Sequence, residues 1–209
     1  MRKLLELPGR DIFLICDADQ QQPAVFYIAD RDAGGILVNA PEYSAHVADE
    51  LNACSPLKFL FIPSHKGALH APQWKAHFRQ LQLISSAEEA TQLQQKPDIE
   101  LDRKTRLTRT IGFIAMSGRT KGTCGLQLRN LPGVVFFGPA LDHASDDGWP
   151  TLIPHEDDFA WENRVIGSLG LQSLNFQYAF CDNYSSQQNM QYGPDAATHI
   201  QHKLETAYE

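Results

Sequence analysis

Short apolar runs of strand length alternate along this chain with segments in which apolar side chains recur at helical spacing. Residues 11–16 (DIFLIC) and 24–29 (AVFYIA) are apolar runs of strand length separated by a polar segment. Residues 42–53 follow with apolar side chains every four positions, which predicts a helix. Residues 57–62 (LKFLFI) are continuously apolar, as is typical of a strand buried on both faces. The patterns in the first third of the chain therefore predict two strands, followed by a strand–helix–strand unit.

The same patterns continue to the end of the sequence, with no repeat of fixed period. They predict, in order, a strand at 36–38, a helix at 72–80, a strand at 83–84, a helix at 85–95, a hairpin of 98–101 and 105–109, strands at 111–116, 124–128 and 133–137, an acidic loop at Asp142–Trp149, a helix at 156–169, a strand at 176–181 and a helix at 195–208. Runs of strands interleaved with single helices favour a layered α/β sandwich over a Rossmann sheet, and no glycine-rich nucleotide-binding motif is present. With 209 residues, we expect one domain covering residues 1–209.

The charge distribution argues against a nucleic-acid partner. The formal net charge is −7, and the densest basic cluster is Arg103, Lys104, Arg106 and Arg109. Such a short cluster is typical of a solvated hairpin, whereas nucleic-acid binding needs a broad basic face. We therefore expect no nucleic-acid partner.

The cysteines and the apolar runs predict a cytoplasmic protein. The cysteines, at positions 16, 54, 124 and 181, are widely spaced and form no C-x-x-C pair, so we expect reduced and mostly buried thiols. Residues 1–10 lack the apolar core of a signal peptide, and no apolar run reaches the length of a membrane span.

The most informative segment is residues 57–78, LKFLFIPSHKGALHAPQWKAHF. An apolar strand ends in Ser64-His65, and His70 follows five residues later, directly before a helix. This resembles the metallo-β-lactamase fold superfamily, in which a strand runs into T-H-x-H-x-D-H and a helix begins at once. In that family the loop presents imidazoles and a carboxylate to two metal ions, which lower the pKa of bound water. Here Gly67 stands at the second histidine and Leu69 at the aspartate.

Further segments resemble the same family in the expected order over residues 24–184. Residues 34–41 resemble an early strand that ends in an aspartate, here Asn39. Residues 117–126 resemble the G-H-T-x-G-S turn, with Thr120 matching and Arg119 in place of the histidine. Residues 134–141 resemble the strand that ends in Gly-Asp, with Pro139 in place of the aspartate. The late strand is followed by Asp182-Asn183-Tyr184, where the family has a histidine.

The resemblance implies a four-layer αββα sandwich, in which two mixed β-sheets are flanked by helices. Among the family's metal-ligand positions, only His65 and His70 keep a donor, so they are the candidate ligands for zinc. Replacement donors could come from loop residues, namely His143, His155, Cys181 and Asp182. An arginine beside a dication would be repelled, so Arg119 favours a site without metal and could instead bind an anion. We therefore expect no cofactor, with zinc as the alternative.

Two functions of different classes follow from these residues. The first is binding of a small anionic ligand or a protein partner, without the usual dinuclear site. The second is a metal-dependent hydrolase of a small ester, thioester or phosphoester that uses an altered site. The candidate binding residues are Ser64, His65, His70, Arg119, Thr120, Cys181 and Asp182. A homodimer that serves only as a scaffold is a third alternative.

Overall fold

A computed structural model of the chain describes residues 1–102 and 104–207. The chain divides into two compact units, Met1–Leu101 and Asp102–Glu209, each of which is described by itself. The predicted basic residue Arg103 lies outside the described residues.

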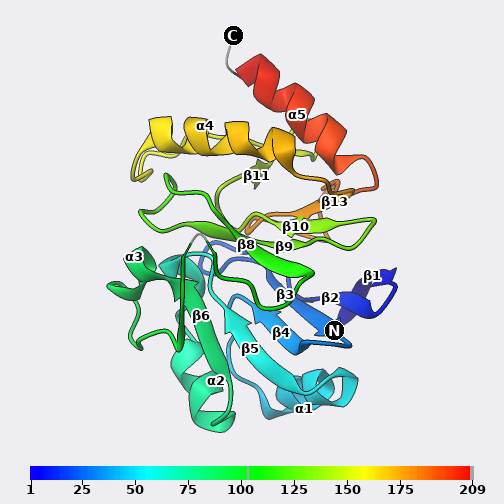
Figure 1. Cartoon of the computed structure of the whole chain (residues 1–209), viewed down its shortest axis with the longest axis vertical. Coiled ribbons are helices and arrows are strands. Elements are labelled where there is room, and N and C mark those ends of the chain that lie inside the picture. Colours follow the sequence, from blue (N-terminus) through cyan, green and yellow to red (C-terminus); the bar gives the residue numbers. More distant parts are fainter. Residues whose placement is uncertain (103, 208–209) are drawn as a thin grey trace. The chain divides into compact units, whose positions relative to one another are not determined.

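The first unit is built on one mixed sheet in the described part of the chain (Figure 1). Its strands lie in chain order and comprise β1 (Arg2–Leu7), β2 (Arg10–Cys16), β3 (Val25–Asp30), β4 (Gly34–Val38), β5 (Leu57–Phe61), β6 (Gln82–Ser86) and β7 (Ile99–Leu101). The strands from β1 to β4 pair antiparallel, and those from β4 to β7 pair parallel. Parallel pairing requires crossovers, and these are made by α1 (Ala45–Cys54), the 3-10 turn η1 (His65–Gly67) with α2 (Ala71–His77), and α3 (Ala87–Ala90).

Helices α1 and α2 cover one face of this sheet (Figure 1). Leu51 of α1 and Trp74 of α2 are fully buried and pack in one cluster with sheet residues such as Leu60. The indole Nε1–H of Trp74 donates to the carbonyl of Pro41 at 2.7 Å, so the buried ring keeps a polar partner. This packing holds α2 against the sheet and against the segment that follows β4.

The second unit carries a smaller mixed sheet in the order β13-β10-β9-β8. Its described elements are β8 (Ile111–Ala115), β9 (Cys124–Leu128), β10 (Val134–Phe136), the short pair β11 (Asp142–His143) and β12 (Pro150–Thr151), α4 (Trp161–Leu169), the 3-10 turn η2 (Gly170–Ser173), β13 (Tyr178–Phe180) and α5 (Ala196–Ala207). Strand β13 pairs parallel with β10, and the other neighbours pair antiparallel. Helices α4 and α5 lie on one face, where Val165 and Ile200 pack against Val135 of the sheet (Figure 1).

Several predicted elements are wrong in detail. Residues 105–109 form no strand in the described structure, and β7 pairs parallel with β6 instead of forming a hairpin. The helix expected at 85–95 is only the single turn α3, because the glutamine-rich segment after it offers no apolar stripe to bury. The helix expected at 156–169 begins at Trp161, and the acidic loop contains β11.

The strand β1 was not predicted. It pairs with β2, and its burial pattern shows exposed or half-buried side chains throughout. An edge strand without a continuous apolar run gives only a weak sequence signal.

Candidate functional site

The loop after β5 contains a histidine that is held by a buried carboxylate. The backbone N–H of His65 donates to Glu89 Oε2 at 2.6 Å, and His65 Nδ1 lies 2.6 Å from the same oxygen. Glu89 is 1% exposed, whereas the His65 side chain is 35% exposed. Nδ1 faces the carboxylate of Glu89, so Nε2 is the ring atom left for a ligand.

Glu89 reaches this position because of how α3 begins. Ser86 caps the helix, and its Oγ accepts from the backbone N–H of Glu89 at 3.2 Å. The Ser86-x-x-Glu89 spacing is that of a capping box, in which the glutamate side chain turns back toward the helix start. The capping-box spacing is present in the sequence and is the signal that could have singled out Glu89.

The remaining positions of the loop offer few donors. Ser64 is fully buried, and its Oγ has no hydrogen-bond partner among the described residues. Leu69 is 59% exposed and carries no donor atom. His70 is half-buried and precedes α2 without a side-chain cap bond.

Gly67 lies against the side chain of Asn39. A Cβ built on Gly67 would fall on Asn39 Oδ1 and only 2.7 Å from Asn39 Cγ. Asn39 is fully buried, adopts a φ of 64°, and donates from Nδ2 to the carbonyl of Ala24 at 2.9 Å. The position that matches the family's second histidine therefore has no room for any side chain while Asn39 keeps its place.

In the second unit, Arg119 is engaged by acidic neighbours. Its guanidinium lies 2.7 Å from Asp157 and 3.5 Å from Asp158, and its side chain is only 10% exposed. Thr120, also predicted as a binding residue, is buried, and its Oγ1 lies 2.6 Å from Thr123 Oγ1. Neither side chain is presented to solvent as an anion contact.

A buried arginine joins the same acidic segment to a histidine. Arg164 has no exposed side-chain area and lies 2.9 Å from Asp158 and 3.3 Å from Asp142. The same oxygen of Asp142, Oδ2, also lies 2.9 Å from Nε2 of His155. The two arginines and their carboxylates thus form one ion-pair network, whose cost of burial is offset by mutual pairing.

The other predicted replacement donors are buried. Burial raises the pKa of the Cys181 thiol well above its usual value, and the nearby carboxylates of Asp142 and Asp182 add to the effect. Burial lowers the pKa of His143 to about 4, although its bond to the carbonyl of Gly148 opposes the shift. Both groups are therefore neutral near pH 7, and Cys181 is a poor thiolate ligand.

The donor set does not fit a dinuclear metal centre. Within residues 1–102 and 104–207, no group of three or more histidine, cysteine, aspartate or glutamate side chains is arranged to hold a metal ion. The reasons are local: the loop position of Gly67 is closed, Leu69 has no donor, and Arg119 already pairs with carboxylates.

The structure resembles solved metallo-β-lactamases over almost its whole length. DIM-1 metallo-β-lactamase matches with a TM-score of 0.70 and 12% identity, covering 99% of this chain and 97% of that one. The chain has the metallo-β-lactamase fold. A metallo-β-lactamase from Pontibacter korlensis matches with a TM-score of 0.69 and 11% identity over 98% of both chains. FIM-1 from Pseudomonas aeruginosa, in its mono-zinc form, matches with a TM-score of 0.66 and 11% identity, covering 98% of this chain and 95% of that one.

Sequence comparison adds no closer relative of this metallo-β-lactamase-fold chain. No family model matches the sequence, and no curated protein does. The predicted α/β sandwich class is confirmed by the structural matches, whereas one domain over residues 1–209 stays a prediction. In the described part of the chain, every helix is too short or too polar to cross a bilayer.

Proposed function

We propose that this metallo-β-lactamase-fold protein binds a small anionic ligand through His65 and does so without a dinuclear metal centre. The observation that carries the proposal is that buried Glu89 contacts both the backbone N–H and Nδ1 of His65 at hydrogen-bond distance. One hydrogen bond holds the ring at Nδ1 and the other holds the backbone of the same residue, so little side-chain entropy is lost when a ligand binds Nε2.

The charges of the loop favour an anion once His65 is protonated. In the doubly protonated ring Nε2 is a donor and can bind a ligand carboxylate or phosphate. Exposed Lys66, the next residue, adds a second positive charge.

The ion pairs of Arg119 make it a poor candidate for contact with an anionic ligand. Because Arg119 pairs with Asp157, an anion would have to compete with a carboxylate that is already in place. We therefore assign the anion contact to the His65 loop alone. A protein partner, a homodimer and a cytoplasmic location stay predictions.

A metal-dependent hydrolase is the second candidate, favoured by one observation. Histidines that bind metals commonly donate their other ring nitrogen to a carboxylate, as His65 does to Glu89. The ligand position at Gly67 is closed and Leu69 has no donor, so His65 and His70 would be the only histidine ligands from this loop. Two imidazoles hold a transition metal far more weakly than the three protein ligands of a catalytic zinc site.

NMR resonances of the histidine rings can distinguish anion binding from metal binding at His65. We would titrate the protein with acetate, with inorganic phosphate and with zinc chloride, and follow the ring carbons of His65 and of His46, whose side chain is 81% exposed. We expect saturable shifts of the His65 ring carbons with an anion, and none at His46. His65→Gln and Glu89→Gln should each weaken anion binding, whereas His46→Gln should not.

Two results would overturn the proposal. Saturation of His65 by micromolar zinc, with no response to either anion, would favour the hydrolase. Equal anion-induced shifts at His46 and His65 would show only a general ionic-strength effect.

A further inference from the structure

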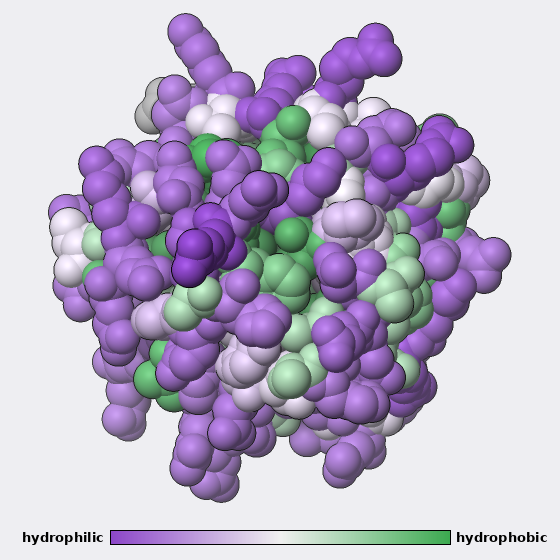
Figure 2. Space-filling view, turned by 90° about the horizontal axis from the view of Figure 1, so that it is seen from below, coloured by the Kyte–Doolittle hydropathy of each residue, from purple (hydrophilic) through white to green (hydrophobic). Residues whose placement is uncertain are grey.

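A separate cavity lies at the amino ends of the parallel strands in the first unit. It has a volume of about 550 Å³, within the size range of small-molecule sites. Its lining comes from the end of α1, the start of β5 and the segment from α2 into β6: Asn52, Pro56, Leu57, Lys58, Phe59 and residues 77–82. Figure 2 views the molecule from the side on which α1 and α2 lie in Figure 1, and hydrophobic side chains gather in the middle of that face.

The cavity lies at the start of β5, whereas His65 follows the end of that strand. Leu57 is the first residue of the strand and Phe61 is the last, so four residue steps of about 3.3 Å separate the two ends by about 13 Å. The loop that carries His65 begins beyond Phe61. The cavity is therefore distinct from the proposed anion contact.

Part of the cavity wall is apolar. Leu57 and Leu81 are buried, and Phe59 and Phe78 are half-buried. The Phe78 ring stacks on buried Trp74, with centroids 6.0 Å apart and planes 6° apart. An apolar ligand body that covers the two half-buried rings would remove hydrophobic surface from water without rearranging the core.

The rim of the cavity is positively charged. Lys58 and Arg79 are exposed, and no ion pair involves either side chain within the described part of the chain. None of the lining residues is acidic, although the protein as a whole carries a net charge of −7. His77 can add a donor, because Tyr43 Oη lies 2.6 Å from Nδ1 and a hydroxyl that donates there leaves the ring proton on Nε2.

We propose that this cavity binds a small apolar carboxylate, such as a medium-chain aliphatic acid. The apolar body would lie against Phe59 and Phe78, and the carboxylate would lie at the rim between Lys58 and Arg79. Both parts of the ligand are needed, since the walls select apolar surface and the rim selects negative charge.

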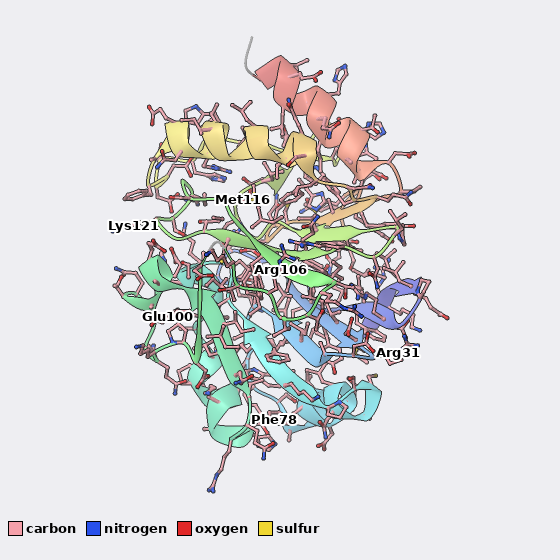
Figure 3. All side chains as sticks on the ribbon, viewed as in Figure 1. Arg31, Phe78, Glu100, Arg106, Met116 and Lys121 are labelled. Carbon is pink, nitrogen blue, oxygen red and sulfur yellow. The ribbon has the colours of Figure 1, made fainter. Side chains whose placement is uncertain are left out.

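Calorimetric titration with octanoate tests the proposal, with acetate and octanol as probes that lack one part each. We expect saturable binding of octanoate and binding at least about tenfold weaker for the other two. Exposed ion pairs are individually weak, so Lys58→Ala or Arg79→Ala should cost about threefold in affinity and the double variant about tenfold. Arg31→Ala is the matched control, because exposed Arg31 lies well away from Phe78 (Figure 3).

A second control separates this site from the His65 loop. His65→Gln should leave octanoate affinity unchanged, whatever it does to phosphate binding. The proposal is overturned if octanoate shows no saturable binding or if octanol binds as tightly. It is equally overturned if Arg31→Ala weakens octanoate as much as the double variant does, or if His65→Gln abolishes octanoate binding.

Discussion

Replacing Gly67 with alanine should destabilise the protein through a clash with Asn39. The added Cβ would lie 2.7 Å from Asn39 Cγ and 3.2 Å from Asn39 Cβ, whereas carbon atoms in contact lie about 3.5–4.0 Å apart. Asn39 is fully buried, so it cannot swing into solvent to make room. Moving its amide would also break the bond from Nδ2 to the carbonyl of Ala24, which is 2.9 Å long.

The expected magnitude follows from these two contributions. Overpacking a tight site costs about 1–3 kcal/mol, and one lost buried hydrogen bond adds about 1 kcal/mol. We therefore expect Gly67→Ala to lower the free energy of unfolding by about 2–4 kcal/mol. In an Asn39→Gly background the same change should cost less than about 1 kcal/mol, because the obstructing side chain is gone and glycine tolerates the φ of 64° at that position.

Urea unfolding of the four proteins in this double-mutant cycle gives the coupling directly. Gly167→Ala in α4 is the control, since its Cβ would meet only Met116 Cα at 3.9 Å and helix propensity predicts a gain of up to about 1 kcal/mol. A cost below about 0.5 kcal/mol for Gly67→Ala, or the same cost in both backgrounds, would refute the reasoning.

Three further predictions concern buried ionisable groups. With a metal chelator present, His65→Ala should lower the free energy of unfolding by about 1–2 kcal/mol, because buried Glu89 loses a hydrogen-bond partner. Urea unfolding that shows no loss, or a loss only when zinc is present, would contradict this. Arg164→Met should cost about 3–5 kcal/mol by urea unfolding, since it removes the buried cation that pairs with both Asp142 and Asp158. A cost under about 1 kcal/mol would argue against the network. Burial lowers the pKa of His143 in the folded protein to about 4, so the unfolded chain takes up a proton first as the pH falls below about 6.5. The free energy of unfolding should therefore decline from about pH 6.5 to about pH 4. His143→Gln should flatten that decline in unfolding experiments, and an unchanged slope would count against a buried neutral ring.

The sequence predicted those parts of the fold that depend on local apolar pattern. The run at residues 57–62 forms β5, and the helix after His70 forms α2, because both elements bury side chains that recur at strand or helix spacing. Strand β1 escaped prediction because its burial depends on pairing with β2 and not on a continuous apolar run.

The candidate site was less predictable because its contacts join residues far apart in the chain. Arg119 suggested an anion contact, but Asp157 and Asp158 lie 38 and 39 positions further on and pair with it. Glu89 lies 24 positions after His65, and nothing in the spacing relates the two. Side chains that complete an ion pair across two loops leave no periodic signal.

We propose that this metallo-β-lactamase-fold protein works without a dinuclear metal centre. The most direct measurement is elemental analysis of untagged protein after equilibration with excess zinc and removal of unbound metal by gel filtration. We predict much less than one zinc ion per chain, because Gly67 and Leu69 offer no donor and Arg119 is paired with carboxylates. Two zinc ions per chain, lost together in His65→Ala, would contradict the account.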